Sequence, residues 1–126
     1  MKQTTLRIGS ASGFWGDSEF AAAQLVQRGN IDVLVFDYLA EITMAILAAA
    51  RAKKPELGYA TDFVEIAMKP VLAEIKRQGI KVVSNAGGIH PQGCAAALRA
   101  LAEAQGVPLR IAVVEGDDLG ARMAEL

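Results

Sequence analysis

Cysteine and histidine each occur only once in this chain of 126 residues, as Cys94 and His90. An internal disulfide is therefore excluded, and so is a zinc site built from several Cys and His side chains of this chain. A lone cysteine and a polar N-terminus without an apolar leader predict a cytoplasmic protein. A Cys–His catalytic pair would have to use these two residues, but Cys94 is better interpreted as a small buried residue.

Two further features are missing: an excess of one charge and a long apolar run. Thirteen Lys and Arg stand against fourteen Asp and Glu, interspersed along the chain, for a net charge of -1. No basic patch for nucleic acid is expected from this balance. No apolar stretch approaches the roughly 20 residues of a membrane span, so no membrane association is expected either. The length fits one domain over residues 1–126.

What the chain does have is an alternation of short β-branched runs and helical patterns. Strands are expected at 6–10, 31–36, 80–84 and 109–114, and helices at 19–28, 41–52, 63–79 with a kink at Pro70, and 91–105. About four parallel strands alternating with helices predict an α/β fold, either a three-layer open sheet or a partial (β/α) barrel. Exposed edge strands would favour a homo-oligomer.

Two helix patterns are specific enough to test. Ile42, Ala45, Ile46 and Ala49 have the spacing of one buried helix face. Asp62 and Glu65 have the spacing of a capping box, which predicts a helix start near residue 63.

The stretch 81–94, KVVSNAGGIHPQGC, organises the candidate site. It predicts a strand, a turn with Asn85, Gly87 and Gly88, and a helix that begins at Pro91. A helix N-terminus favours a carboxylate or phosphate, and the paired glycines would let a ligand approach the backbone. We interpret these three turn residues as ligand-binding. His90 should stay neutral near pH 7 at this helix end and exchange a proton with a ligand, unless it is only the N-cap.

Carboxylates follow two other expected strands. Asp37 ends the second strand, and Glu115 and Asp117 follow the fourth. Because ligands bind outside the carboxyl ends of parallel strands, we interpret Asp37, Glu115 and His90 as catalytic candidates and Asp117 as ligand-binding. Glu41 is a further ligand-binding candidate, although it could equally serve only its helix N-terminus. Together with Asp118 these acids could hold Mg²⁺, but their spacing does not require it, so no metal ligand and no cofactor is assigned.

The first loop, GSASGFWGDS, is the remaining candidate segment. Its glycines match neither the dinucleotide fingerprint nor the P-loop. Asp37 nevertheless stands where a ribose-binding acid would, so a nucleotide-binding domain remains an alternative. Phe14 and Trp15 form either a plug over the sheet edge or a wall for an apolar ligand. The ligand-binding candidates of this loop are Ser10, Gly13, Trp15, Gly16 and Asp17.

Five blocks in order resemble the N-terminal part of the acyclic terpene utilisation protein AtuA family: RIGSASGFWGDS, IDVLVFDYLAEITMAIL, LGYATDFV, IKVVSNAGGIHPQGCAAALRAL and VVEGDD. The resemblance implies a role in bacterial catabolism of citronellol and geraniol, a route that passes through geranyl-CoA. It also implies that the chain is the N-terminal portion of a longer protein, whose remainder would be a partner. His90 stands where the family more often has Asn.

The two lines of argument together predict an α/β domain that binds a carboxylate or acyl-CoA intermediate of terpenoid or other branched-acid breakdown. Lyase or hydratase chemistry beside a carbonyl is the reaction type to expect if the protein is an enzyme. The alternatives are a non-catalytic subunit or interaction module of an acyl-CoA carboxylase complex, and the nucleotide-binding domain.

Overall fold

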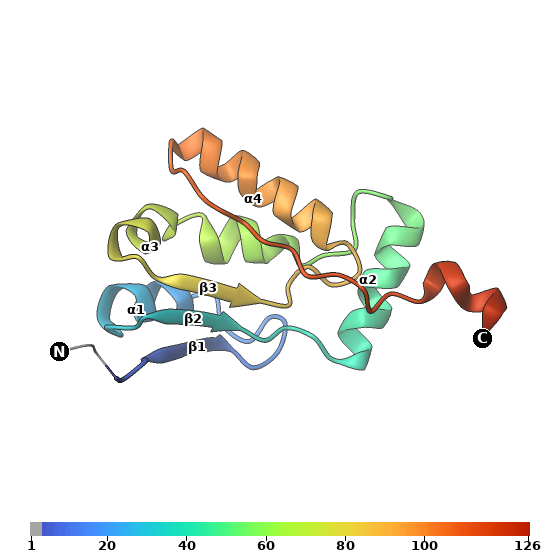
Figure 1. Cartoon of the computed structure of the whole chain (residues 1–126), viewed down its shortest axis with the longest axis horizontal. Helices are drawn as coiled ribbons and strands as arrows, with labels where there is room; N and C mark the ends of the chain where they lie inside the picture. Colours follow the sequence, from blue (N-terminus) through green and yellow to red (C-terminus); the bar gives the residue numbers. More distant parts are fainter. Residues whose placement is uncertain (1–3) are drawn as a thin grey trace.

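The computed structural model describes residues 4–126, and Figure 1 shows its arrangement. The elements follow one another in this order: β1 (Ile8–Ser12), α1 (Ala21–Arg28), β2 (Val33–Phe36), α2 (Glu41–Lys53), the π-helix η1 (Phe63–Met68), α3 (Leu72–Gln78), β3 (Lys81–Ser84), α4 (Pro91–Gln105) and the 3₁₀-helix η2 (Gly120–Glu125). No helix within residues 4–126 combines the length and apolarity needed to cross a bilayer.

The sheet has three parallel strands in the order β1-β2-β3, which confirms the α/β class and the open parallel sheet. Val33 in the central strand lies opposite Ile8 on one side and Lys81 on the other. The β-branched sequence of β2 suits this central position, where both of its edges are paired.

The predicted fourth strand is wrong. Residues 109–114 run extended between α4 and β3, but they pair with no strand in the described part of the chain (Figure 1). Gly106 ends α4 in the left-handed conformation at φ 65°, and Val107 and Leu109 then pack against the core. The residues that follow line a groove together with β3 and form no ladder with it.

The two faces of the sheet differ. Ala11, Leu34 and Phe36 are buried in the same core as α1, η1, α3 and α4. On the opposite face Ile8 is 62% exposed and Val83 58% exposed. Among the described residues the molecule therefore has two layers, not the three that were predicted. A parallel sheet usually carries cover on both faces, so this open apolar face is unusual.

Three aromatic rings close the core near the carboxyl ends of the strands. Phe36 meets Phe63 and Tyr38 edge to face, at ring-centroid distances of 5.0 and 5.8 Å. Burial, with a smaller contribution from the charge of Asp62, raises the pKa of Tyr38 to about 12. This cluster anchors the segment after β2 and thereby fixes Asp37, which lies between Phe36 and Tyr38.

Several predicted helix boundaries hold. Helix α1 ends at Arg28 as predicted but begins two residues later than predicted, at Ala21, and Oγ of Ser18 accepts the backbone N–H groups of Phe20 and Ala21 just before it. The helical segment breaks around Pro70 as predicted, and α3 ends at Gly79 with φ 70°. The capping box at Asp62 is wrong, because this side chain makes no cap hydrogen bond.

The predicted buried face of α2 is also wrong. Ile42 is 71% exposed and Ile46 50% exposed, whereas Thr43 and Leu47 are buried. The helix does not lie along the sheet but crosses beyond the carboxyl ends of the strands (Figure 1). It therefore buries the side that meets the turn after β3, and the isoleucine stripe faces away.

Candidate functional site

The turn after β3 is held from outside by the loop that follows α2. The backbone N–H of Ala60 donates to the carbonyl of Ala86 at 2.9 Å, and the N–H of Ile89 donates to the carbonyl of Gly58 at 3.0 Å. Two backbone hydrogen bonds in opposite directions fix the turn against this loop. The carboxyl end of β3 is thus a rigid part of the molecule.

Both glycines of the turn are explained by contacts within the protein. Gly88 has φ 54°, and a Cβ there would lie 2.6 Å from the carbonyl oxygen of Gly58 and would clash with Leu47. A Cβ on Gly87 would come within 2.9 Å of Pro91. Packing therefore requires the lack of a side chain at both positions, apart from any contact with a ligand.

Asp37 and Asn85 meet as the parallel topology predicts. Asn85 donates from Nδ2 to Oδ1 of Asp37 at 2.8 Å and accepts at its own Oδ1 the N–H of Tyr38 at 2.7 Å. The carbonyl of Ser12 accepts the N–H of Asp37 at 3.3 Å. The carboxyl ends of all three strands are thereby connected, and Asp37 is exposed to solvent at this edge of the sheet.

A groove of about 790 Å³ opens beside this connection. It lies between β3, the start of α4 and the extended segment after residue 110. Five of the predicted site residues line it: Asn85, Gly88, His90, Glu115 and Asp117. The groove is therefore where the largest share of the predicted site comes together.

His90 occupies the N-cap position of α4, but its side chain makes no cap hydrogen bond. Its ring lies over Gly93, where any Cβ would clash with the imidazole, and the Tyr59 ring is 6.4 Å away between centroids. Burial and then the positive charge of Arg51 lower the pKa of His90. The imidazole is accordingly neutral near pH 7, for reasons other than the helix N-terminus invoked from the sequence.

Arg51 is the lining residue that sequence reasoning missed. It donates a hydrogen bond from Nη1 to the backbone carbonyl of Ile89, and its stem lies so close to Gly58 that a Cβ there would be 3.0 Å from Cδ. The available signal was its position four residues after Leu47, which places both on one helix face. The prediction took the opposite face of α2 as buried, and Arg51 was therefore not considered as a site residue.

The acidic segment after residue 114 forms the outer wall of the groove. Glu115 accepts a hydrogen bond at Oε2 from Nε2 of Gln92 at 3.0 Å, which links this segment to α4. Asp118 accepts the N–H of Gly120 at 2.8 Å and so starts the last helix. Within residues 4–126 no three His, Cys, Asp or Glu side chains gather as metal ligands would, and the Mg²⁺ alternative gains nothing from this arrangement.

The candidates of the first loop and the start of α2 lie outside the groove. Asp17 accepts the N–H of Gly13 at 2.8 Å, so a protein carboxylate already takes the place an anionic ligand would need. Trp15 packs against the core and donates from Nε1 to Asp62 at 2.7 Å. These contacts fit the plug interpretation for Trp15 but not for Phe14, which is 60% exposed. The other candidates that do not line the groove are Ser10, Gly16, Asp37, Glu41 and Gly87.

Cys94 lies in the first turn of α4 and is buried. Burial raises the pKa of its thiol to about 11, so the group is protonated at neutral pH. The interpretation of Cys94 as a small buried residue is confirmed.

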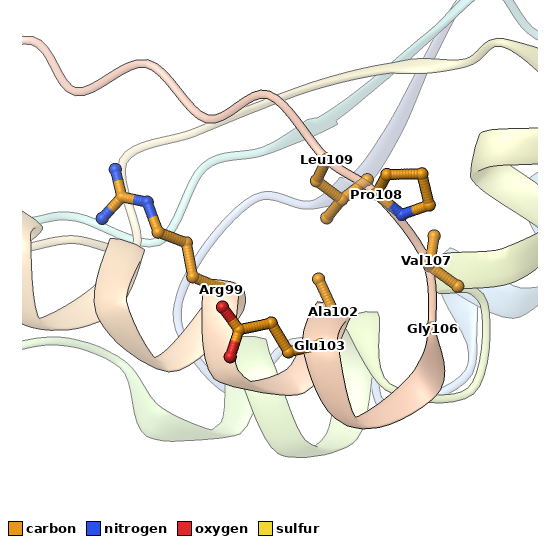
Figure 2. Close-up of a pocket in the computed structure, with 7 residues that line it drawn as sticks. All are labelled: Arg99, Ala102, Glu103, Gly106, Val107, Pro108 and Leu109. Carbon is orange, nitrogen blue, oxygen red and sulfur yellow. The ribbon is translucent and has the colours of Figure 1, made fainter.

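A second, shallower pocket of about 420 Å³ lies at the other end of α4 (Figure 2). Its charged lining residues are Arg99 and Glu103, and the rest of its wall comes from Ala102 and the segment 106–109. None of the predicted site residues reaches it.

Comparison with known families decides the affiliation of the chain. Residues 6–126 match the acyclic terpene utilisation family protein AtuA. The chain belongs to the AtuA family. The match spans almost the whole sequence, confirms the resemblance carried by the five sequence blocks, and supports a role in acyclic terpene utilisation at the level of the family. No significant match was found among curated proteins or among solved structures.

Proposed function

We propose that this AtuA-family chain binds a carboxylate or acyl-CoA intermediate of acyclic terpene or other branched-acid breakdown in the groove beside β3. The observation that carries the proposal is the mixed lining of the groove. Val82, Ile111 and Val113 supply apolar surface, while Asn85 and His90 supply polar groups at the carboxyl end of β3. A pocket of this size that combines apolar surface with polar groups suits an amphipathic small molecule.

The reacting groups of the proposal are His90, Glu115 and Asp37. His90 and Glu115 line the groove, and a neutral imidazole can take a proton from a carbon beside a carbonyl. Asp37 does not line the groove and acts through its hydrogen bond to Asn85, whose amide it orients. This division of roles fits lyase or hydratase chemistry, because Asp37 takes one of the two N–H donors of the Asn85 amide and the second can donate to a developing oxyanion.

Thermal unfolding with added ligands tests the proposal. Citronellate, geranyl-CoA, free CoA and a dinucleotide are added one at a time, and the unfolding midpoint is measured. A terpenoid acid or its thioester should raise the midpoint, because a ligand that binds only the folded state stabilises it by mass action. The variants Asn85→Ala and Glu115→Gln should shrink that shift. A midpoint raised by the dinucleotide alone would instead support the nucleotide-binding alternative, and no shift with any ligand would overturn the proposal.

The open sheet face favours a second candidate, an interaction module. Exposed Ile8 and Val83 form an apolar surface that a second copy, the remainder of a longer family protein or a carboxylase subunit would cover. Sedimentation velocity distinguishes this candidate from the first. A faster-sedimenting species in the absence of any small molecule, together with no midpoint shift from the ligands above, would favour the module.

A further inference from the structure

The charges that line the groove are unevenly distributed. Arg51 is the one Lys or Arg side chain in the lining, and it enters from α2 beside the turn after β3. Glu115, Asp117 and Asp118 lie on the outer wall. Any anionic group that enters the groove therefore meets a single positively charged side chain and three carboxylates in the same lining.

The guanidinium of Arg51 has no carboxylate partner among the described residues, so it is available to bind an anionic ligand. Its side chain is half-buried, and it forms no salt bridge with any carboxylate in the described part of the chain, although four other ion pairs are present there. One of its donors bonds the carbonyl of Ile89, a neutral group. A partly desolvated guanidinium without a counter-ion keeps donors free for a carboxylate or phosphate.

We infer that Arg51 binds the carboxylate of a free branched acid, and that the hydrocarbon chain of this acid lies along Val82, Ile111 and Val113. The inference rests on the proposed function and narrows it to the free acid. A CoA thioester lacks the carboxylate that Arg51 would bind, because thioester formation removes that charge. Its phosphates carry several negative charges, which one arginine facing three carboxylates does not balance.

A purely structural role for Arg51 would be to tie α2 to the turn after β3 through Ile89. That role would affect stability and would not discriminate between ligands. Discrimination between a charged and an uncharged ligand of the same skeleton is therefore the decisive readout.

Isothermal titration of the full chain with citronellate, citronellol and the CoA thioester of citronellate provides the test. The acid should bind at least about tenfold more tightly than the alcohol and the thioester, because a hydrogen bond between two charged groups is stronger than one to a neutral group. Arg51→Gln should lose about tenfold in affinity for the acid and little for the alcohol. Arg99→Gln, in the pocket of Figure 2, is the matched control and should leave both affinities unchanged.

The outcomes separate the inference from the proposed function. Tighter binding of the thioester than of the acid would overturn the inference and leave the proposed function standing. Equal affinity of the wild type for acid and alcohol would also overturn it, and this comparison needs no variant to fold. Unchanged acid affinity in a folded Arg51→Gln would do the same. Binding of none of the three ligands would overturn both, whereas retained acid preference in Arg51→Lys would support the inference.

Discussion

Gly88 is the residue on which the rigid turn after β3 depends most directly. Gly88→Ala should lower the free energy of unfolding by about 2 to 4 kcal/mol, because left-handed strain and overpacking add up. The strain comes from φ 54°, and the overpacking from Leu47 and Gly58. Urea denaturation measures the loss.

Gly79 is the matched control for this prediction. It too has a positive φ, 70°, but a Cβ there meets no atom within 4 Å. Gly79→Ala should therefore cost only the backbone strain, about 1 to 2 kcal/mol. Equal losses at the two positions would mean that the space above Gly88 is not filled as described.

The titration of His90 should make the free energy of unfolding depend on pH. Its pKa is lower in the folded chain than the usual 6.5, so the unfolded state binds the proton more readily. This contribution to stability is complete above about pH 6.5 and is lost as the pH falls toward the folded pKa. Because the chain has no other histidine, urea midpoints measured between about pH 5 and 7 should fall with acidity in the wild type and much less in His90→Asn. A slope that survives in the variant would assign the effect to other groups.

Cys94 offers a second check at the residue scale. The buried, protonated thiol should react with a thiol reagent far more slowly at pH 8 than an exposed cysteine, because the thiolate is the reactive form. Denaturant should restore the ordinary rate. Fast labelling of the native chain, followed by mass spectrometry, would contradict the burial.

At the scale of the element, substitutions on the two faces of α2 should differ most clearly in their effect on stability. Leu47→Ala should cost about 2 to 5 kcal/mol, because Leu47 is buried against the turn. Ile46→Ala, one residue earlier, should change the stability by at most about 0.5 kcal/mol. Urea denaturation of the two variants compares them directly, and the reverse order would restore the buried face predicted from the sequence.

The sequence could not decide the orientation of α2, because it contains two apolar stripes. Ile42 and Ile46 form the stronger one, and local periodicity favours it. The helix crosses the strand ends instead of lying on the sheet, and this tertiary placement determines which stripe is buried. For the same reason Arg51, one helical turn after Leu47, was not predicted as a site residue. The meeting of Asp37 with Asn85, by contrast, was predictable, because parallel strands bring their carboxyl ends together.

A similar limit applies to residues 109–114. Their β-branched composition predicts an extended backbone, and the backbone is extended. Pairing depends on the position of the neighbouring strand as well as on the segment itself, and here no ladder with β3 forms. Extension was therefore predictable, while membership of the sheet was not.

At the scale of the whole molecule, the uncovered sheet face should promote association. The chain should sediment faster as its concentration rises, because Ile8, Val83 and their neighbours can remove apolar surface from water only by meeting another surface. Ile8→Lys should shift the equilibrium toward the monomer. Ile46→Lys, which adds the same charge on α2, should not. A monomer at every concentration would show that the face stays open in solution.

The bond between Trp15 and Asp62 has one more consequence. Trp15 is the chain's single tryptophan, and it connects the loop after β1 to the start of η1 at the carboxyl end of the sheet. The tryptophan fluorescence of the protein therefore comes from one indole, which is hydrogen-bonded to Asp62 and does not line the groove. Its emission should therefore report unfolding at the carboxyl end of the sheet, and no label has to be introduced.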